Sequence, residues 1–196
     1  MKKYYQLWAI GLAVLITSCT TLPPQPSLSW QNQQKILSKR TQWSLTGKIA
    51  VRTAKESGSA TLQWQQDNAQ YIVQLYNPLG TSSVKLVGKP GKVVLEDASG
   101  SRATSTNPSQ LLLEQTGWQL PIENLYYWIR SLPVPNHAYK ASRDVQHRLL
   151  SLSQQGWYIQ YLEYTTPQAG FSLPRKIVLE SQGIQVKMVI YEWEFH

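Results

Sequence analysis

With 196 residues, the chain is long enough for one domain with a hydrophobic core and too short for two comfortable ones. Hydrophobic residues make up 42% of the sequence and charged residues 15%, which excludes charge-driven disorder as a description of the whole chain. The net charge is +8, but lysines and arginines are spread from Lys35 to Lys187 without a basic run. We therefore expect an anionic lipid surface or an acidic partner, and no nucleic acid.

The N-terminus has the layout of an export signal. Lys2 and Lys3 precede ten apolar residues, Leu7–Ile16, which are too few to span a hydrocarbon core of roughly 30 Å. Cys19 follows and is the only cysteine of the chain, so it has no partner for an internal disulfide. We predict a cleaved signal peptide over residues 1–18, whose removal takes two lysines and leaves +6 of the +8 net charge.

Residues 16–19, Ile-Thr-Ser-Cys, resemble the bacterial lipobox, in which the cysteine is acylated and becomes the new N-terminus. The resemblance implies an S-diacylglyceryl and an N-acyl group on Cys19, and at ~0.8 kcal/mol per buried CH₂ three chains anchor a protein firmly. Thr20 is not the aspartate of retained inner-membrane lipoproteins, which implies the outer membrane. Residues 19–29 would be the lipidated N-terminus and a proline-rich linker. An ordinary signal peptide with a chance cysteine is the alternative.

After a short polar helix expected over residues 31–39, alternation with a period of two indicates β-strands. Apolar residues alternate with polar ones within residues 45–51, 60–65, 71–75, 84–86 and 93–95. Turn residues separate these runs at Ser57-Gly58, Lys89-Pro90-Gly91-Lys92 and Asp97–Gly100. The Pro-Gly pair fits the second and third positions of a type II turn, so we expect a hairpin there.

The period changes in the middle of the chain, where we expect two helices. Asn107-Pro108 supplies a cap and a proline at the first helical position, ahead of three leucines and Gly117. A second helix opens at Pro121 and ends by Pro133, with apolar residues at helical spacing. Because this region carries few charges, both helices must cover another apolar surface.

Strands resume after the helices, over residues 144–152, 157–164, 175–180 and 184–193. The total is about ten antiparallel strands with one apolar face. We therefore predict a mainly β domain over residues 30–196. Its single antiparallel sheet curls into an unclosed β-barrel, and the helices form a lid packed into the concave side.

The sequence contains no motif of a catalytic, metal or nucleotide site. G-x-S-x-G, H-E-x-x-H, a Walker sequence and paired cysteines are all missing. Asp144 and His147 are three residues apart, which on a strand places them on opposite faces. We therefore expect no enzyme activity, no cofactor and no metal.

Asn77-Pro78-Leu79-Gly80 joins two predicted strands and has the residue preferences of a type I turn. Leu79 occupies the tip, an unusual place for a bulky apolar side chain because connecting loops run over the solvated surface. Either the loop folds over so that Leu79 caps the core, or the loop presents an apolar side chain to a partner.

Together, the lipobox, the strand pattern and the N-P-L-G turn resemble the LolB family of outer-membrane lipoprotein receptors, which work with the periplasmic carrier LolA. The resemblance covers nearly the whole chain. It implies a hydrophobic cavity inside the unclosed barrel, which accepts the acyl chains of a lipoprotein from LolA before the lipoprotein enters the outer membrane. It also implies that Leu79 is exposed and takes part in insertion. Besides the lipobox and N-P-L-G, the matching segments are Thr46-Gly47, Trp64-Gln65-Gln66, Pro90-Gly91, Gly117-Trp118-Gln119-Leu120-Pro121, Trp128-Ile129 and Leu132-Pro133.

Inward-facing positions are the candidates for the lining of this cavity, although a solid core would use the same residues. The implied partners are LolA, lipoprotein acyl chains and outer-membrane phospholipid, and we expect a monomer that faces the periplasm. Two alternatives stay open: a lipid-anchored scaffold or assembly factor with a filled core, and an enzyme acting on envelope material. The lining candidates are Ile49, Leu62, Trp64, Val73, Leu75, Leu86, Leu125, Ile129, Val186 and Met188.

Overall fold

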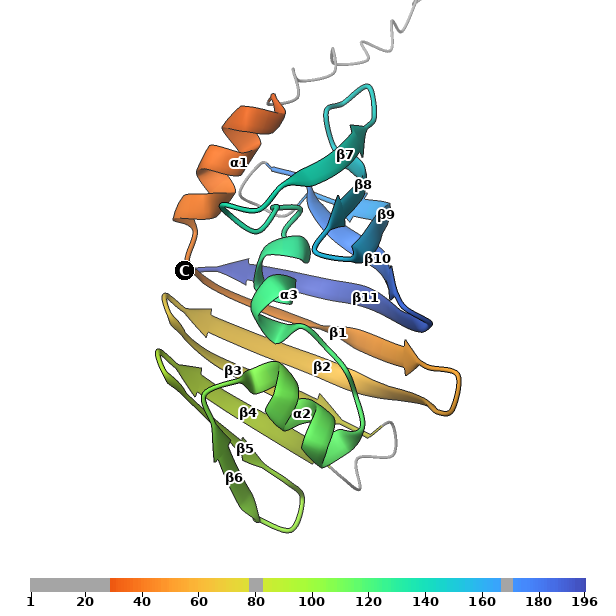
Figure 1. The fold of residues 1–196 in the computed structure, drawn as a ribbon. Helices are drawn as coiled ribbons and strands as arrows, with labels where there is room; N and C mark the ends of the chain where they lie inside the picture. Colours follow the sequence, from red (N-terminus) through yellow and green to blue (C-terminus); the bar gives the residue numbers. More distant parts are fainter. Residues whose placement is uncertain (1–28, 78–82, 167–170) are drawn as a thin grey trace, which may run out of the picture.

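The computed structural model describes residues 29–77, 83–166 and 171–196. Within them, eleven strands form one antiparallel sheet in the order β6-β5-β4-β3-β2-β1-β11-β10-β9-β8-β7. β6 and β7 are its two edges, so the sheet curves without closing (Figure 1). The prediction of a mainly β fold with one unclosed antiparallel sheet is confirmed.

The first six strands run from the centre of the sheet to one edge. They are β1 (Gln42–Arg52), β2 (Ser57–Asp67), β3 (Gln70–Tyr76), β4 (Ser83–Lys89), β5 (Lys92–Glu96) and β6 (Arg102–Ser105). Every second residue of β1 and β2 is buried, as the alternation predicts. Lys89 pairs with Lys92 across the predicted hairpin, and Gly91 has a φ of 73°, as a type II turn requires.

The reversal predicted at Ser57-Gly58 is wrong, because both residues belong to β2 and pair with the end of β1. The chain turns earlier, where the backbone N–H of Thr53 donates to the carbonyl of Glu56 at 2.8 Å. The Thr53 hydroxyl also accepts hydrogen bonds from the backbone N–H groups of Lys55 and Glu56. A side chain that bonds to its own backbone makes this turn without glycine.

The other five strands continue from the centre to the second edge. They are β11 (Ile184–Phe195), β10 (Leu173–Ser181), β9 (Trp157–Thr165), β8 (Leu149–Gln154) and β7 (Tyr139–Arg143). Residues 144–152, predicted as one strand, instead form a turn followed by β8. The Asp144 carboxylate accepts the backbone N–H groups of Gln146 and Arg148 at 2.9 Å, and His147 has a φ of 63°. Asp144 and His147 therefore lie in a turn rather than on opposite faces of a strand.

Strand register places the predicted interior residues side by side. Ile49 of β1 pairs with Met188 of β11, and Val51 pairs with Val186. On the other flank, Leu62 of β2 pairs with Leu75, Trp64 pairs with Val73, and Val73 pairs in turn with Leu86. Adjacent pairs of this kind form a continuous apolar face.

Three helices accompany the sheet: α1 (Trp30–Lys39), α2 (Pro108–Thr116) and α3 (Ile122–Trp128). α2 has the predicted ends, because the Asn107 side chain accepts the backbone N–H of Gln110 and Gly117 is left-handed. α3 stops at Trp128, ahead of the predicted limit, and Ser131 has a φ of 58° just beyond it. In Figure 1, α3 crosses one face of the sheet, and α2 follows the chain after β6 and contacts β5 and β6.

Candidate functional site

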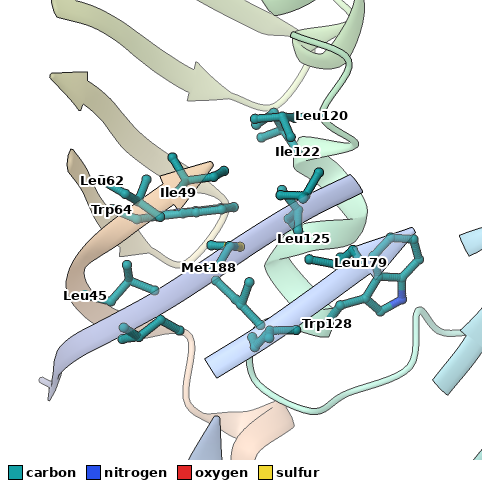
Figure 2. Close-up of a cluster of buried hydrophobic side chains, with 14 of the residues drawn as sticks. Leu45, Ile49, Leu62, Trp64, Leu120, Ile122, Leu125, Trp128, Leu179 and Met188 are labelled. Carbon is teal, nitrogen blue, oxygen red and sulfur yellow. The ribbon is translucent and has the colours of Figure 1, made fainter. Parts of the chain in front are cut away.

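The ten predicted lining residues form one apolar interior beneath α3, and each is at most 6% exposed. Figure 2 shows Leu62, Trp64 and Met188 on the strands, gathered opposite Leu125 of α3. Their shared interior agrees with the sequence pattern, whereas their contact with a ligand stays a prediction. The ten are Ile49, Leu62, Trp64, Val73, Leu75, Leu86, Leu125, Ile129, Val186 and Met188.

In this conformation the interior is occupied by the protein's own side chains. Leu120 and Ile122, from the α2–α3 connection and the start of α3, belong to the same core cluster as the strand residues beneath them (Figure 2). Dispersion and hydrophobic burial hold such a cluster together without directional bonds. The strand residues of this cluster are therefore covered by α3 and the residues next to it.

A cavity of about 550 Å³ borders this interior where α3 faces β2 and β3. Its walls include Trp64, Tyr71, Ile122, Tyr126 and Tyr127. The volume falls within the ~300–1,000 Å³ typical of small-molecule sites. Burial, and to a lesser extent the nearby Glu123 carboxylate, raises the pKa of Tyr71, so the tyrosine hydroxyl stays neutral. Glu123 also lines the cavity and contributes a carboxylate to its wall. Trp64, one of the ten candidates, forms part of this wall, although only 2% of it is exposed.

Arg130 fixes the C-terminal end of α3 to the end of α1. Its guanidinium is buried and donates to the carbonyls of Leu37 at 3.1 Å, Arg40 at 2.9 Å and Tyr126 at 2.9 Å. It also lies 4.1 Å from the centre of the Tyr126 ring. Burial lowers the pKa of this guanidinium, and Tyr126 offsets part of that shift, yet arginine keeps its charge in proteins. One buried cation thus joins two helices.

Gln154 and Tyr161 fix the same end of α3 to the sheet. The Gln154 side chain accepts from Trp128 Nε1 at 3.0 Å and from the Val134 backbone N–H at 2.8 Å, and it donates to the Val134 carbonyl at 2.9 Å. The Tyr161 hydroxyl donates to the Trp128 carbonyl at 3.0 Å. Burial, and to a lesser extent Tyr164, raises the pKa of Tyr161, so the hydroxyl keeps the proton that it donates.

The N-terminal end of α3, together with α2, contacts the sheet mainly through apolar side chains. Leu111 and Leu112 of α2 are buried. The Trp118 indole lies directly on Gly58 of β2, where an added Cβ would stand 2.9 Å from Trp118 Cζ2. The two helices are joined to each other by Ser109, which donates to Glu123 at 2.6 Å. α2 and the start of α3 therefore form a unit that lies on the sheet mainly through apolar surfaces, with one exposed hydrogen bond from Asn124 to Gln155 of the β8–β9 turn at 2.6 Å.

Several predicted functional residues lie outside the described residues: Cys19, and Pro78, Leu79 and Gly80 of the N-P-L-G turn. Asn77, the first residue of that turn, directly follows β3. Their proposed roles in lipidation and membrane insertion stay predictions. No described helix has the length and apolar character needed to cross a membrane. No cluster of potential metal ligands occurs in the part of the chain that the structure describes.

Sequence reasoning missed the residues that fix α3. Arg130 directly follows the apolar residues Trp128 and Ile129. A charged residue next to apolar ones was the signal that could have identified it. Its partner Leu37 is 93 residues away, so nothing local identified the contact. Gln154 resembled an ordinary polar strand end, yet it is 3% exposed.

A family model described as "Outer membrane lipoprotein LolB" matches residues 41–193. The outer-membrane lipoprotein LolB of Pseudomonas syringae pv. syringae (strain B728a) is 37% identical over 191 residues, which is 94% of this chain and 93% of the relative. LolB of Pseudomonas putida (strain GB-1) is 41% identical over 165 residues, 84% of this chain and 80% of the relative. Both names describe outer-membrane lipoproteins, and neither names an enzyme.

The fold has a counterpart among solved structures. An outer membrane lipoprotein-sorting protein domain from Vibrio parahaemolyticus superposes with a TM-score of 0.54 and 9% identity, covering 86% of this chain and 94% of that one. At that identity the likeness concerns the fold alone. The sequence relatives go further: the chain belongs to the LolB family of outer-membrane lipoproteins.

Proposed function

We propose that this protein accepts lipoproteins from a LolA-type periplasmic carrier by binding their acyl chains and inserts them into the outer membrane. The observation that carries the proposal is the apolar interior of an unclosed sheet, covered by helices that rest on it through apolar surfaces. Membership of the LolB family supports the same function. An acyl chain has no polar group to satisfy along its length, so such an interior suits it.

The lid opens at the α2 end and turns about the C-terminal end of α3. At the hinge, Arg130, Gln154 and Tyr161 hold the backbone with directional hydrogen bonds. At the other end, an acyl chain replaces the contacts of Ile122 and Leu125 with contacts of the same kind. Opening therefore costs little there, because the dispersion lost between side chains is regained against the ligand.

Transfer in this scheme makes and breaks no covalent bond and consumes no nucleotide. Apolar surface removed from water contributes roughly 25 cal/mol per Å². The acyl chains therefore move in one direction if each successive site removes more of their surface from water. The three sites are the carrier, this interior and the bilayer.

Two residues outside the described part complete the proposal. Lipid on Cys19 anchors the protein, and Leu79 touches the bilayer while the cargo leaves. Burial of one leucine contributes ~1.5–3 kcal/mol, which suffices for a brief contact and not for anchoring. The N-P-L-G turn directly follows β3, the strand that carries the interior residues Val73 and Leu75, so the contact would form close to the released acyl chains.

A transfer assay tests the binding step. The Cys19→Ala chain, which carries no lipid, is mixed with carrier loaded with a lipoprotein, and the two proteins are separated to see which one holds the cargo. We expect the cargo on this protein, and we expect a fluorescent fatty acid to bind it and be displaced by lipoprotein. Cargo that stays on the carrier, with no fatty-acid binding, would favour the scaffold with a filled core.

The insertion step is tested with Leu79→Glu. The substitution should leave folding and cargo uptake intact and stop delivery to outer-membrane vesicles, because a carboxylate does not enter hydrocarbon. Val87→Glu is the matched control, since Val87 of β4 is 42% exposed and adds the same charge elsewhere. Delivery by Leu79→Glu at the rate of the control would refute the role of Leu79.

A further inference from the structure

The turn between β7 and β8 presents an apolar side chain to solvent. Val145 is 88% exposed at its tip. Leu150 of β8 is 47% exposed and Leu162 of β9 is 52% exposed. The last pair of the β8–β9 ladder is Ser151 with Gln160, so both leucines lie just beyond that pair, at the end of the sheet that carries the β7–β8 turn. Together, Val145, Leu150 and Leu162 form an apolar patch that we name the β7–β9 corner.

Cations outnumber carboxylates around this corner. Arg148 forms an ion pair with Asp144 at 2.7 Å, and Glu163 is shared by Arg175 and Lys176 at 3.5 Å from each. Arg143, on the exposed side of β7, adds a further positive charge. Apolar side chains among excess cations match the chemistry of an anionic phospholipid surface, where the cations meet phosphates and the side chains meet acyl carbon.

The corner also lies where the chain leads toward its proposed lipid anchor. The Arg143 guanidinium stacks on Trp30, the first residue of α1, at 5.2 Å from the ring centre. Figure 1 shows the β7–β8 hairpin beside the start of α1. Only nine residues lie between Cys19 and Ser29, and the ten steps from one to the other, at ~3.5 Å per step, reach at most about 35 Å. The anchor therefore keeps this corner close to the bilayer.

The opposite end of the sheet has different features. The β1–β2, β8–β9 and β10–β11 turns border a cavity of about 1070 Å³ there, with Arg52, Gln155 and Gln185 among its walls. Antiparallel order places the β3–β4 connection, between Tyr76 and Ser83, at this same end. A domain resting on its β7–β9 corner would turn this end away from the bilayer.

We propose that the β7–β9 corner is a membrane-contact surface that docks the domain onto anionic phospholipid, with the opposite end of the sheet directed into the periplasm. The inference rests on the lipid anchor of the proposed function. Contact at the corner leaves the lid and the far end accessible to an incoming carrier. Delivery through the N-P-L-G turn would then require the domain to turn on its linker.

A fluorescent label reports which end meets lipid. Acylation consumes the Cys19 thiol, so Val145→Cys or Ala54→Cys adds a single reactive thiol to the lipidated full-length chain. Ala54 is an exposed residue of the β1–β2 turn at the far end, which makes it the matched control. Each chain is labelled with the polarity-sensitive dye NBD and reconstituted into vesicles of phosphatidylethanolamine and phosphatidylglycerol.

We expect the emission at position 145 to shift to shorter wavelength and gain intensity, and the emission at position 54 to stay as in buffer. Replacing phosphatidylglycerol by phosphatidylcholine should diminish the shift. A protein that floats with vesicles but shows no shift at 145, or equal shifts at both positions, overturns the proposed orientation. A protein that stays in solution and takes up a second label refutes the anchor at Cys19, and the orientation with it.

Discussion

The two ends of α3 are held by different physical forces. At its C-terminal end, Arg130, Gln154 and Tyr161 donate or accept at fixed angles, and each is nearly excluded from solvent. At its N-terminal end, Ile122 and Leu125 pack against the strands through apolar contacts, and the one side-chain hydrogen bond to the sheet given there, from Asn124 to Gln155, is exposed to solvent. Hydrogen bonds specify one geometry, whereas apolar contacts accept any partner of similar shape. The C-terminal end of α3 is therefore held in one position, whereas the apolar contacts of its N-terminal end can be replaced by those of another apolar partner.

This difference indicates how a filled interior can still be a binding site. Ligand-free, the interior is closed by its own side chains. A ligand that offers the same apolar contacts can replace the contacts that Ile122 and Leu125 make with the strands. It cannot replace the hydrogen bonds of Arg130, Gln154 and Tyr161. Substitutions at the two ends should therefore differ in a specific way. Fatty acid should stabilise a variant at the apolar end more than it stabilises the parent, and it should stabilise a hinge variant no more than the parent.

Arg130→Ala should have the largest effect, lowering the free energy of unfolding by about 4 kcal/mol in urea titrations. The Leu37 and Arg40 carbonyls lose a charged donor, Tyr126 loses its stacked cation, and a cavity remains. Arg130→Lys should recover part of the loss, because one ammonium does not reproduce the planar fork.

Arg102→Ala is the control for that series. Arg102 pairs with Glu96 on the surface at 2.8 Å with its side chain 69% exposed, so its loss should cost less than about 1 kcal/mol. Equal losses at the two arginines would show that Arg130 does not act as a fixed point.

Leu125→Ala should cost about 3 kcal/mol, because it removes buried methyl groups beneath the lid. At one fatty-acid concentration, ~100 times the dissociation constant of the parent, the parent should gain about 2.7 kcal/mol and Leu125→Ala should gain more. The readout is thermal or urea unfolding with and without fatty acid. If the variant gains no more stability from fatty acid than the parent does, Leu125 does not cover the ligand site.

Gln154→Leu should cost about 2 kcal/mol while nearly keeping the side-chain volume. Trp128 Nε1 and both backbone groups of Val134 would be left buried without their partner. Because the loss is polar, added fatty acid should stabilise this variant no more than it stabilises the parent. A larger gain than in the parent would mean that the hinge and the apolar end are not separate.

Local chemistry made much of this fold predictable. Asn107, Gly117 and the Pro90-Gly91 turn behave as their residue types dictate, and the alternation located the interior. The edge strands β6 and β7 were missed because they have only four and five residues, none of which is fully buried. The Asp144 turn was missed because a carboxylate replaced glycine as the turn former.

The site divides in the same way. Its apolar half could be predicted, because each strand reveals its inward face through its own periodicity. Its polar half could not, because Arg130 and Gln154 meet partners that lie far away in the sequence. A single sequence records that such residues are polar, and it does not record which carbonyl they reach.

The smallest effect, and the one most diagnostic of the hinge, concerns Tyr161. At neutral pH, Tyr161→Phe should cost about 1 kcal/mol, since the Trp128 carbonyl loses one neutral donor. The folded pKa of Tyr161 is raised, so its stabilising contribution is present below the unfolded value of about 10 and is lost as the pH rises above it. Each such tyrosine then costs about 1.4 kcal/mol per pH unit.

Phenylalanine has no proton to lose, so the parent and Tyr161→Phe stability curves should cross near pH 11. Urea titrations from pH 7 to 11.5 measure this crossing. Tyr191→Phe serves as the control, because it removes a tyrosine hydroxyl from a residue that is 57% exposed. Curves of Tyr161→Phe and the parent that stay parallel up to pH 11.5 would mean that solvent reaches the hydroxyl. The hinge would then be open at the point where it is proposed to be fixed.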